Sequence, residues 1–141
     1  MKRPFLIIIL CACIIAGCKK DDAQKDAEVT VLGKWYVKSI YSSGGISAGT
    51  NTAFTANDYY LFNNDKTVVI SQSTPTAVSA TLAYSYVKDS SGEKITLSNT
   101  DRTTVYNVSK LTADSLVMAT APGSGGGATV ISNATYRFAR K

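Results

Sequence analysis

Few residues of this sequence could do covalent chemistry. The chain of 141 residues contains no histidine, which excludes histidine-based proton relays and imidazole ligands for a metal. Among its 10 Asp and Glu, Asp89 and Glu93 flank a turn and are expected to be solvated, which disfavours a paired-carboxylate hydrolase. We therefore expect no enzymatic activity, no catalytic residues, no metal site and no cofactor. The remaining candidate is the thiol of Cys18, at the end of an apolar N-terminal run.

The N-terminal segment has the layout of a secretory signal, with Lys2 and Arg3 before an apolar run over Phe5–Ile15. A helix over this run would rise roughly 16 Å, too short to cross a hydrocarbon core of ~30 Å. The segment Ile15-Ala16-Gly17-Cys18 resembles the lipobox of bacterial lipoproteins. The resemblance implies that residues 1–17 are a signal peptide and that Cys18 is lipidated and becomes the mature N-terminus. The alternative is an ordinary signal peptide, cleaved at another small residue.

Residues 18–30 follow as a polar stretch without an apolar face, which predicts a disordered tether after the lipidated cysteine. Its start, Lys19-Lys20-Asp21-Asp22, is similar to the export tag of Bacteroidetes surface lipoproteins. This resemblance implies a protein held in the outer membrane by its lipid and displayed on the cell surface. The alternative is a solvated tether that faces the periplasm.

The charge of the chain predicts no nucleic-acid partner. The net charge is +5, two of the positive charges lie in the leader, and the remainder is spread without blocks. The partner that we expect is the membrane, reached through Cys18, whereas a protein partner is not identified by the sequence.

Residues 31–141 predict a single all-β domain. Short β-rich runs alternate with turn residues, and apolar residues recur at every second position within several of the runs. About eight antiparallel strands joined by short turns would close most simply into an up-and-down barrel, with a two-sheet β-sandwich as the alternative. The expected strands are Val31–Tyr41, Tyr59–Asn63, Thr67–Gln72, Ala80–Val87, Lys94–Ser98, Thr103–Lys110, Ser115–Ala121 and Ala128–Ala139.

The first of these runs contains Leu32-Gly33-Lys34-Trp35, which looks like the Gly-x-Trp opening of lipocalin-like domains. Later segments such as Tyr60-Leu61-Phe62 and Leu111–Val117 resemble the lipocalin-like lipoproteins common in Bacteroidetes. The resemblance implies that Trp35 closes one end of the barrel and that an arginine near the C-terminus stacks on it. That arginine would be Arg137, or alternatively Arg140.

Inward-pointing aromatic residues are the candidate ligand-binding residues. We expect a small apolar ligand to bind without catalysis at the open end of the barrel, beneath a lid formed by Ser42–Asn57. The alternative is a barrel filled by side chains, which would act as an interaction module for an envelope protein or glycan. The residues expected to line the ligand site are Tyr60, Phe62, Tyr84, Tyr86 and Tyr106.

Replacing Cys18 with alanine removes the thiol to which the lipid would be attached, so the Cys18→Ala protein should leave the membrane fraction. Immunoblotting of fractionated cells measures this change, with Cys11→Ala as the control because Cys11 would be removed with the leader. Retention of the Cys18→Ala protein in the membrane fraction would contradict the assignment of the anchor.

Overall fold

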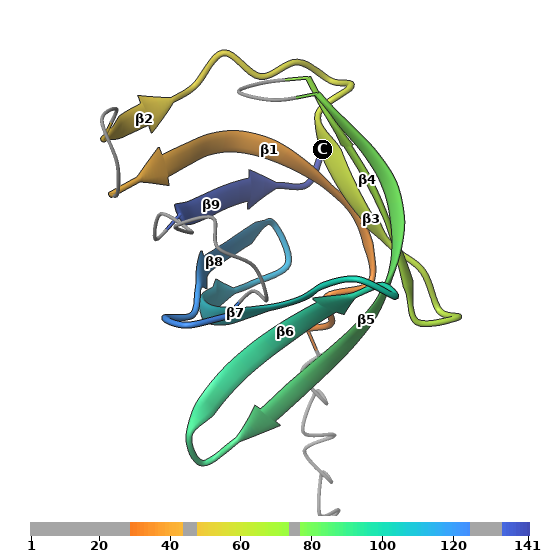
Figure 1. The fold of residues 1–141 in the computed structure, drawn as a ribbon. Coiled ribbons are helices and arrows are strands. Elements are labelled where there is room, and N and C mark those ends of the chain that lie inside the picture. Colours follow the sequence, from red (N-terminus) through yellow and green to blue (C-terminus); the bar gives the residue numbers. More distant parts are fainter. Residues whose placement is uncertain (1–28, 44–47, 74–76, 125–133) are drawn as a thin grey trace, which may run out of the picture.

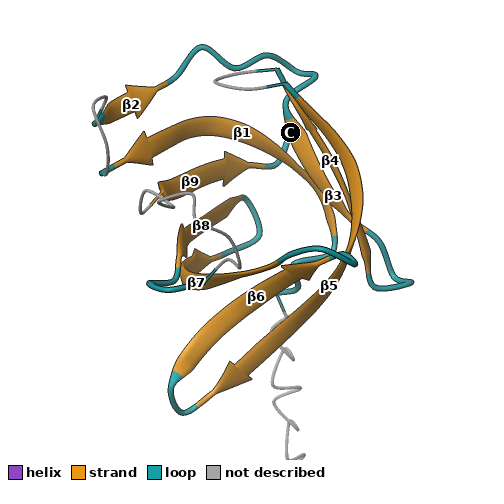
Figure 2. Cartoon of the chain, in the orientation of Figure 1, coloured by secondary structure: helices purple, strands orange, loops and turns teal. Residues whose placement is uncertain are grey.

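The computed structural model describes residues 29–43, 48–73, 77–124 and 134–141. The expected signal peptide, the lipidation at Cys18 and most of the expected tether lie outside these residues. Within them, all regular structure is β-strand (Figure 2). The same residues therefore contain no helix of the length and apolarity that a membrane span requires.

Nine strands form one antiparallel sheet (Figure 1). Short turns join most successive strands, and the β5–β6 hairpin extends well beyond the rest of the barrel in this view. The strands are β1 (Gly33–Ser42), β2 (Gly49–Asn51), β3 (Tyr59–Phe62), β4 (Thr67–Gln72), β5 (Val78–Asp89), β6 (Gly92–Ser98), β7 (Thr103–Leu111), β8 (Ser115–Thr120) and β9 (Ala134–Ala139).

The sheet closes on itself because β1 pairs on both of its edges. Its first half, Gly33–Tyr36, pairs with β3, and the segment Tyr36–Ser42 pairs with β9. The short strand β2 pairs with the last residues of β1, on the edge that β3 leaves free. The result is a closed barrel of eight strands with β2 as an addition, which confirms the predicted all-β barrel over the β-sandwich.

Alternation of buried and exposed side chains explains why these segments form the wall of a barrel. On β8, Leu116, Met118 and Thr120 are buried, whereas the intervening residues are half-buried and face outward. Tight turns let the chain reverse between strands: Lys66 adopts a left-handed conformation with φ 65° before β4, and Gly92 has φ 118° at the start of β6. Because successive strands are antiparallel, the turns that join them lie alternately at one end of the barrel and at the other.

The end at which β1 begins and β9 finishes is closed by Trp35, which is fully buried. The indole Nε1 donates a hydrogen bond of 2.7 Å to the Val31 carbonyl oxygen. The guanidinium of Arg140 lies 4.2 Å from the centre of the Trp35 ring. Its Nη2 also donates to the carbonyl oxygens of Leu32, at 2.5 Å, and Thr30, at 3.0 Å. Arg140 therefore joins the last residues of the barrel to the segment that leads into β1.

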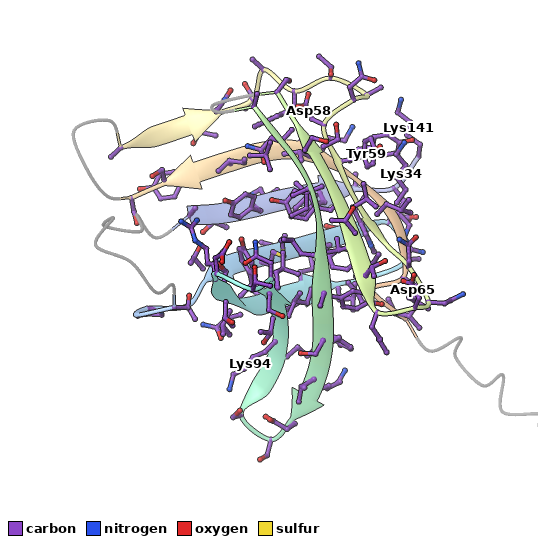
Figure 3. All side chains as sticks on the ribbon, turned by 45° about the vertical axis from the view of Figure 1, so that its right-hand side comes forward. Lys34, Asp58, Tyr59, Asp65, Lys94 and Lys141 are labelled. Carbon is purple, nitrogen blue, oxygen red and sulfur yellow. The ribbon has the colours of Figure 1, made fainter. Side chains whose placement is uncertain are left out.

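The arginine that stacks on Trp35 is thus Arg140 and not Arg137, which corrects the primary assignment from sequence. The alternation along β9 gives the reason. Phe138 points inward and is buried, so Arg137 points outward and is exposed, while Arg140 has the inward phase again. The same rule sends Lys34 outward, where its Nζ lies 3.7 Å from the centre of the Tyr59 ring (Figure 3).

Replacing Arg140 with methionine should lower the free energy of unfolding by about 2 kcal/mol, because it removes a cation–π contact and two hydrogen bonds to carbonyl groups. Urea denaturation followed by Trp35 fluorescence measures the change. Arg137→Met is the matched control and should change stability by less than about 0.5 kcal/mol, since Arg137 is exposed. Equal effects of the two substitutions would contradict the role of Arg140.

Candidate functional site

A cavity of about 390 Å³ lies at the opposite, open end of the barrel. It is bounded by the last residues of β1 and β4 and by the first residues of β5, β7 and β9, which all meet at this end. Apolar side chains from several strands form much of its lining. These are Ile40, Ile70, Val78, Leu82, Leu97 and Ala134.

Three tyrosine rings form the floor and one side of the cavity. The Tyr106 and Tyr136 rings meet edge to face, with centroids 5.7 Å apart, and the Tyr60 and Tyr136 centroids are 6.3 Å apart. Below them, Phe138 packs edge to face on Tyr60 at 5.0 Å. The rings therefore separate the cavity from the packed closed half of the barrel.

Burial raises the pKa of Tyr60, Tyr106 and Tyr136 above the ordinary value for a phenol. For Tyr106, the electrostatic influence of the neighbouring Tyr136 and a side-chain hydrogen bond between the two residues raise the pKa further. All three phenols are consequently neutral at physiological pH. Neutral phenols bring hydrogen-bond donors, rather than negative charge, to the cavity.

The other polar groups of the lining lie toward the mouth. They are Ser42 at the end of β1, Gln72 at the end of β4, Arg102 directly before β7 and Thr104 at the beginning of β7. Among the described residues, Arg102 is the only charged residue that lines the cavity, and its side chain is exposed.

The structure divides the expected ligand-binding residues between two places. Tyr60 and Tyr106 line the open-end cavity together. Tyr84 and Tyr86 lie toward the closed end, where they line a smaller hollow of about 210 Å³ beside Val31.

Phe62 lines neither space. It is almost completely buried and packs edge to face on Tyr84, with centroids 5.0 Å apart. Alternation along a strand identifies the side chains that point inward but does not give their height in the barrel. Because β5 runs from the open end to the closed end, Leu82 reaches the cavity and Tyr84 does not.

Tyr136 and Arg102 are among the cavity residues that sequence reasoning missed as site residues. Tyr136 belongs to the visible alternation Ala134, Tyr136, Phe138, so the signal for an inward ring was present. Arg102 follows Asn99, Thr100 and Asp101 in a polar turn, and nothing in its local sequence indicates that it borders a cavity. Its position depends on the register of β7 against β6 and β8.

The residues expected to form a lid, Ser42–Asn57, are partly described and contain β2. This segment leads to Asp58, a buried carboxylate (Figure 3). Asp58 Oδ2 accepts hydrogen bonds from the backbone N and Oγ1 of Thr55, at 2.6 and 2.9 Å. Its Oδ1 accepts from the backbone N and Oγ of Ser73, at 2.5 and 2.6 Å. One carboxylate therefore ties the segment before β3 to the end of β4, next to cavity residue Gln72.

Burial alone would raise the pKa of Asp58, but the hydrogen bonds from Ser73 and Thr55 outweigh it and hold the pKa well below its usual value. Asp58 is therefore charged at neutral pH and acts as an acceptor for four hydrogen bonds. Its contacts are with the protein, so it supports the rim of the cavity and is not placed to act on a ligand.

The arrangement can bind a molecule by apolar contact and hydrogen bonds. Within the described part of the chain, no three His, Cys, Asp or Glu residues come close enough to hold a metal ion. The described residues that line the cavity offer donors and apolar surface and include no carboxylate. Such a lining is typical of small-molecule binding sites.

Comparison with protein families gives one match. Residues 31–118 match the family described as a lipocalin-like domain. The search of curated proteins and the search of solved structures each return no significant match.

Replacing Asp58 with asparagine should lower the free energy of unfolding at pH 7 by about 2 kcal/mol, because the amide cannot accept all four hydrogen bonds. The native carboxylate has a lowered pKa, so its stabilisation is fully present well above the unfolded pKa of 3.8 and is lost as the pH falls through and below that value. The difference between wild type and Asp58→Asn should therefore shrink between pH 5 and the acid limit of about pH 2. Urea denaturation across this range measures it.

The exposed Asp114 provides the control for this experiment. Asp114→Asn should leave the unfolding free energy within about 0.5 kcal/mol of wild type at pH 7. A constant difference between wild type and Asp58→Asn at all pH values would contradict a role for the Asp58 charge.

Proposed function

This chain belongs to the lipocalin-like domain family, and from that membership we propose that it binds a small, largely apolar molecule in its open-end cavity without transforming it. The observation that carries the proposal is the cavity of about 390 Å³, which falls within the range of about 300–1,000 Å³ usual for ligand pockets. The family supports a fold that binds ligands, and the lining supports an apolar one.

The interior of the barrel is divided in a way that favours ligand binding over a filled barrel. In the closed half, side chains such as Trp35, Phe62 and Leu116 are almost completely buried and pack against one another. In the open half, Ile40, Ile70 and Leu82 border empty space instead. A barrel that served only as a rigid interaction module would have no need for this space.

We also propose that the domain is attached to the outer membrane through a lipid on Cys18 and is displayed on the cell surface. The leader, the Ile15–Cys18 segment and the Lys19–Asp22 segment support this proposal. The fold is compatible with it, since the chain enters β1 at the closed end, beside Arg140. An anchor on the N-terminal side would leave the cavity opening away from the point of attachment.

Filling the cavity should abolish binding while the fold is kept. Ala134 lies on β9 and lines the cavity, so Ala134→Trp should place an indole in the ligand space. The probe is N-phenyl-1-naphthylamine, a neutral apolar dye, and its fluorescence titration should give at least tenfold weaker binding for the variant.

Ala119→Trp is the matched control, because Ala119 pairs with Thr135 of β9 and has the outward phase of β8. This variant should bind the dye as wild type does. If wild type does not bind the dye, or if both variants bind it equally well, the cavity is not the ligand site.

A further inference from the structure

Three hydrogen-bond donors of the cavity lie on one stretch of chain, at and just before the start of β7. Arg102, Thr104 and Tyr106 are spaced two residues apart, Arg102 directly before β7 and the other two on it, and all three line the cavity. Residues two apart on a strand share one face and are about 7 Å apart along it. The three side chains therefore form a line of donors that runs from the mouth toward the floor.

The side chains that β1, β4 and β5 place below the mouth of the cavity are apolar, whereas Ser42 of β1 and Gln72 of β4 lie near the mouth. Ile40 of β1, Ile70 of β4 and Leu82 of β5 offer no polar atoms to a ligand. A bound molecule would therefore meet apolar surface at Ile40, Ile70 and Leu82, and it would meet donors near the mouth and along the start of β7. This asymmetry suits an amphipathic molecule better than a hydrocarbon.

The charge at the mouth is positive, and in the described part of the chain no ion pair neutralises it. The ion pair found among the described residues joins Lys88 to Glu93 and does not involve Arg102. Asp101 is adjacent to Arg102 in sequence, but it lies in the turn before β7 and its side chain is exposed. It accepts a hydrogen bond from Thr100. No Asp or Glu is present among the described residues that line the cavity.

The guanidinium of Arg102 is close enough to Tyr106 to affect its hydroxyl. Burial and Tyr136 raise the pKa of the Tyr106 hydroxyl, and the charge of Arg102 acts in the opposite direction. A cation and a neutral phenol thus face the same part of the cavity.

We propose that the cavity selects amphipathic anions, with an apolar body against the Ile40, Ile70 and Leu82 walls and an acidic head group at Arg102. A carboxylate, sulfonate or phosphate head group would accept hydrogen bonds from the guanidinium and from Thr104 or the tyrosine hydroxyls. This inference rests on the proposed function, because it specifies the ligand of the same cavity. Arg102 is then the residue that determines specificity.

Two dyes with the same apolar body separate the contribution of the charge from that of the body. 1-Anilinonaphthalene-8-sulfonate carries a sulfonate, and N-phenyl-1-naphthylamine does not. Wild-type protein should bind the sulfonate at least tenfold more tightly, and Arg102→Gln should lose about tenfold in affinity for the sulfonate only. Raising NaCl from 50 to 500 mM should weaken binding of the sulfonate and leave binding of the neutral dye unchanged.

Lys38→Gln is the control for net charge, because Lys38 is an exposed cation on β1 that does not line the cavity. It should leave both affinities unchanged. Ala134→Trp should abolish binding of both dyes, which locates the sulfonate in the cavity rather than on a basic surface.

Each outcome has a defined meaning. If both dyes bind with equal affinity and Arg102→Gln affects neither, anion selection is wrong while the cavity remains a ligand site. If Lys38→Gln weakens binding of the sulfonate dye as much as Arg102→Gln does, general surface charge explains the preference for the anionic dye, and the inference is overturned. If neither dye binds to wild-type protein, the proposed function itself fails.

Discussion

The pairing of β1 with both β3 and β9 is the interaction on which the rest of the structure depends. It removes the free edges that an open sheet would present and encloses an interior. An irregularity between Val37 and Ser39 shifts the register as β1 runs along β9. Such a bulge increases local twist, which helps one long strand to serve two partners. Without this pairing there would be neither a packed core nor a cavity, because both are defined by closure of the wall.

Most of the fold could be predicted from the sequence because its signals are local. Alternation and turn residues located the strands closely, and turns such as that at Asp89 are stabilised by their own side chains, as in the hydrogen bond from Ser91 Oγ. The polar strand β2, Gly49–Asn51, carries no such pattern and was not anticipated. It forms because the end of β1 offers an unpaired edge, which is a property of the assembled sheet.

The candidate site was predicted less well because it depends on two properties of each side chain. One is whether the side chain points into or out of the barrel (its phase), and the other is its position along the barrel axis (its height). Arg140 and Arg137 differ only in the direction of their side chains. Because residues alternate along a strand, counting from the inward Phe138 on β9 would have identified Arg140 as the inward arginine. Tyr106 and Tyr84 both point inward but lie at different heights, Tyr106 at the open-end cavity and Tyr84 toward the closed end. The height of a residue follows only from the registers of all strands around the barrel. Asp58 illustrates a third difficulty, since its partner Ser73 is 15 residues away and neither residue has a distinctive local sequence. Long-range polar contacts of this kind leave no periodic signal.

The contact between Arg140 and the carbonyl oxygen of Thr30 has a consequence for the connectivity of the chain. The donor and acceptor are 3.0 Å apart although the residues are separated by 110 positions in the sequence. A short glycine-rich linker could therefore join the two ends of the barrel, and the chain could be reopened elsewhere in an exposed turn. Circular permutation would preserve every strand pairing. The order of the strands along the chain is thus one of several orders that the same closed wall permits.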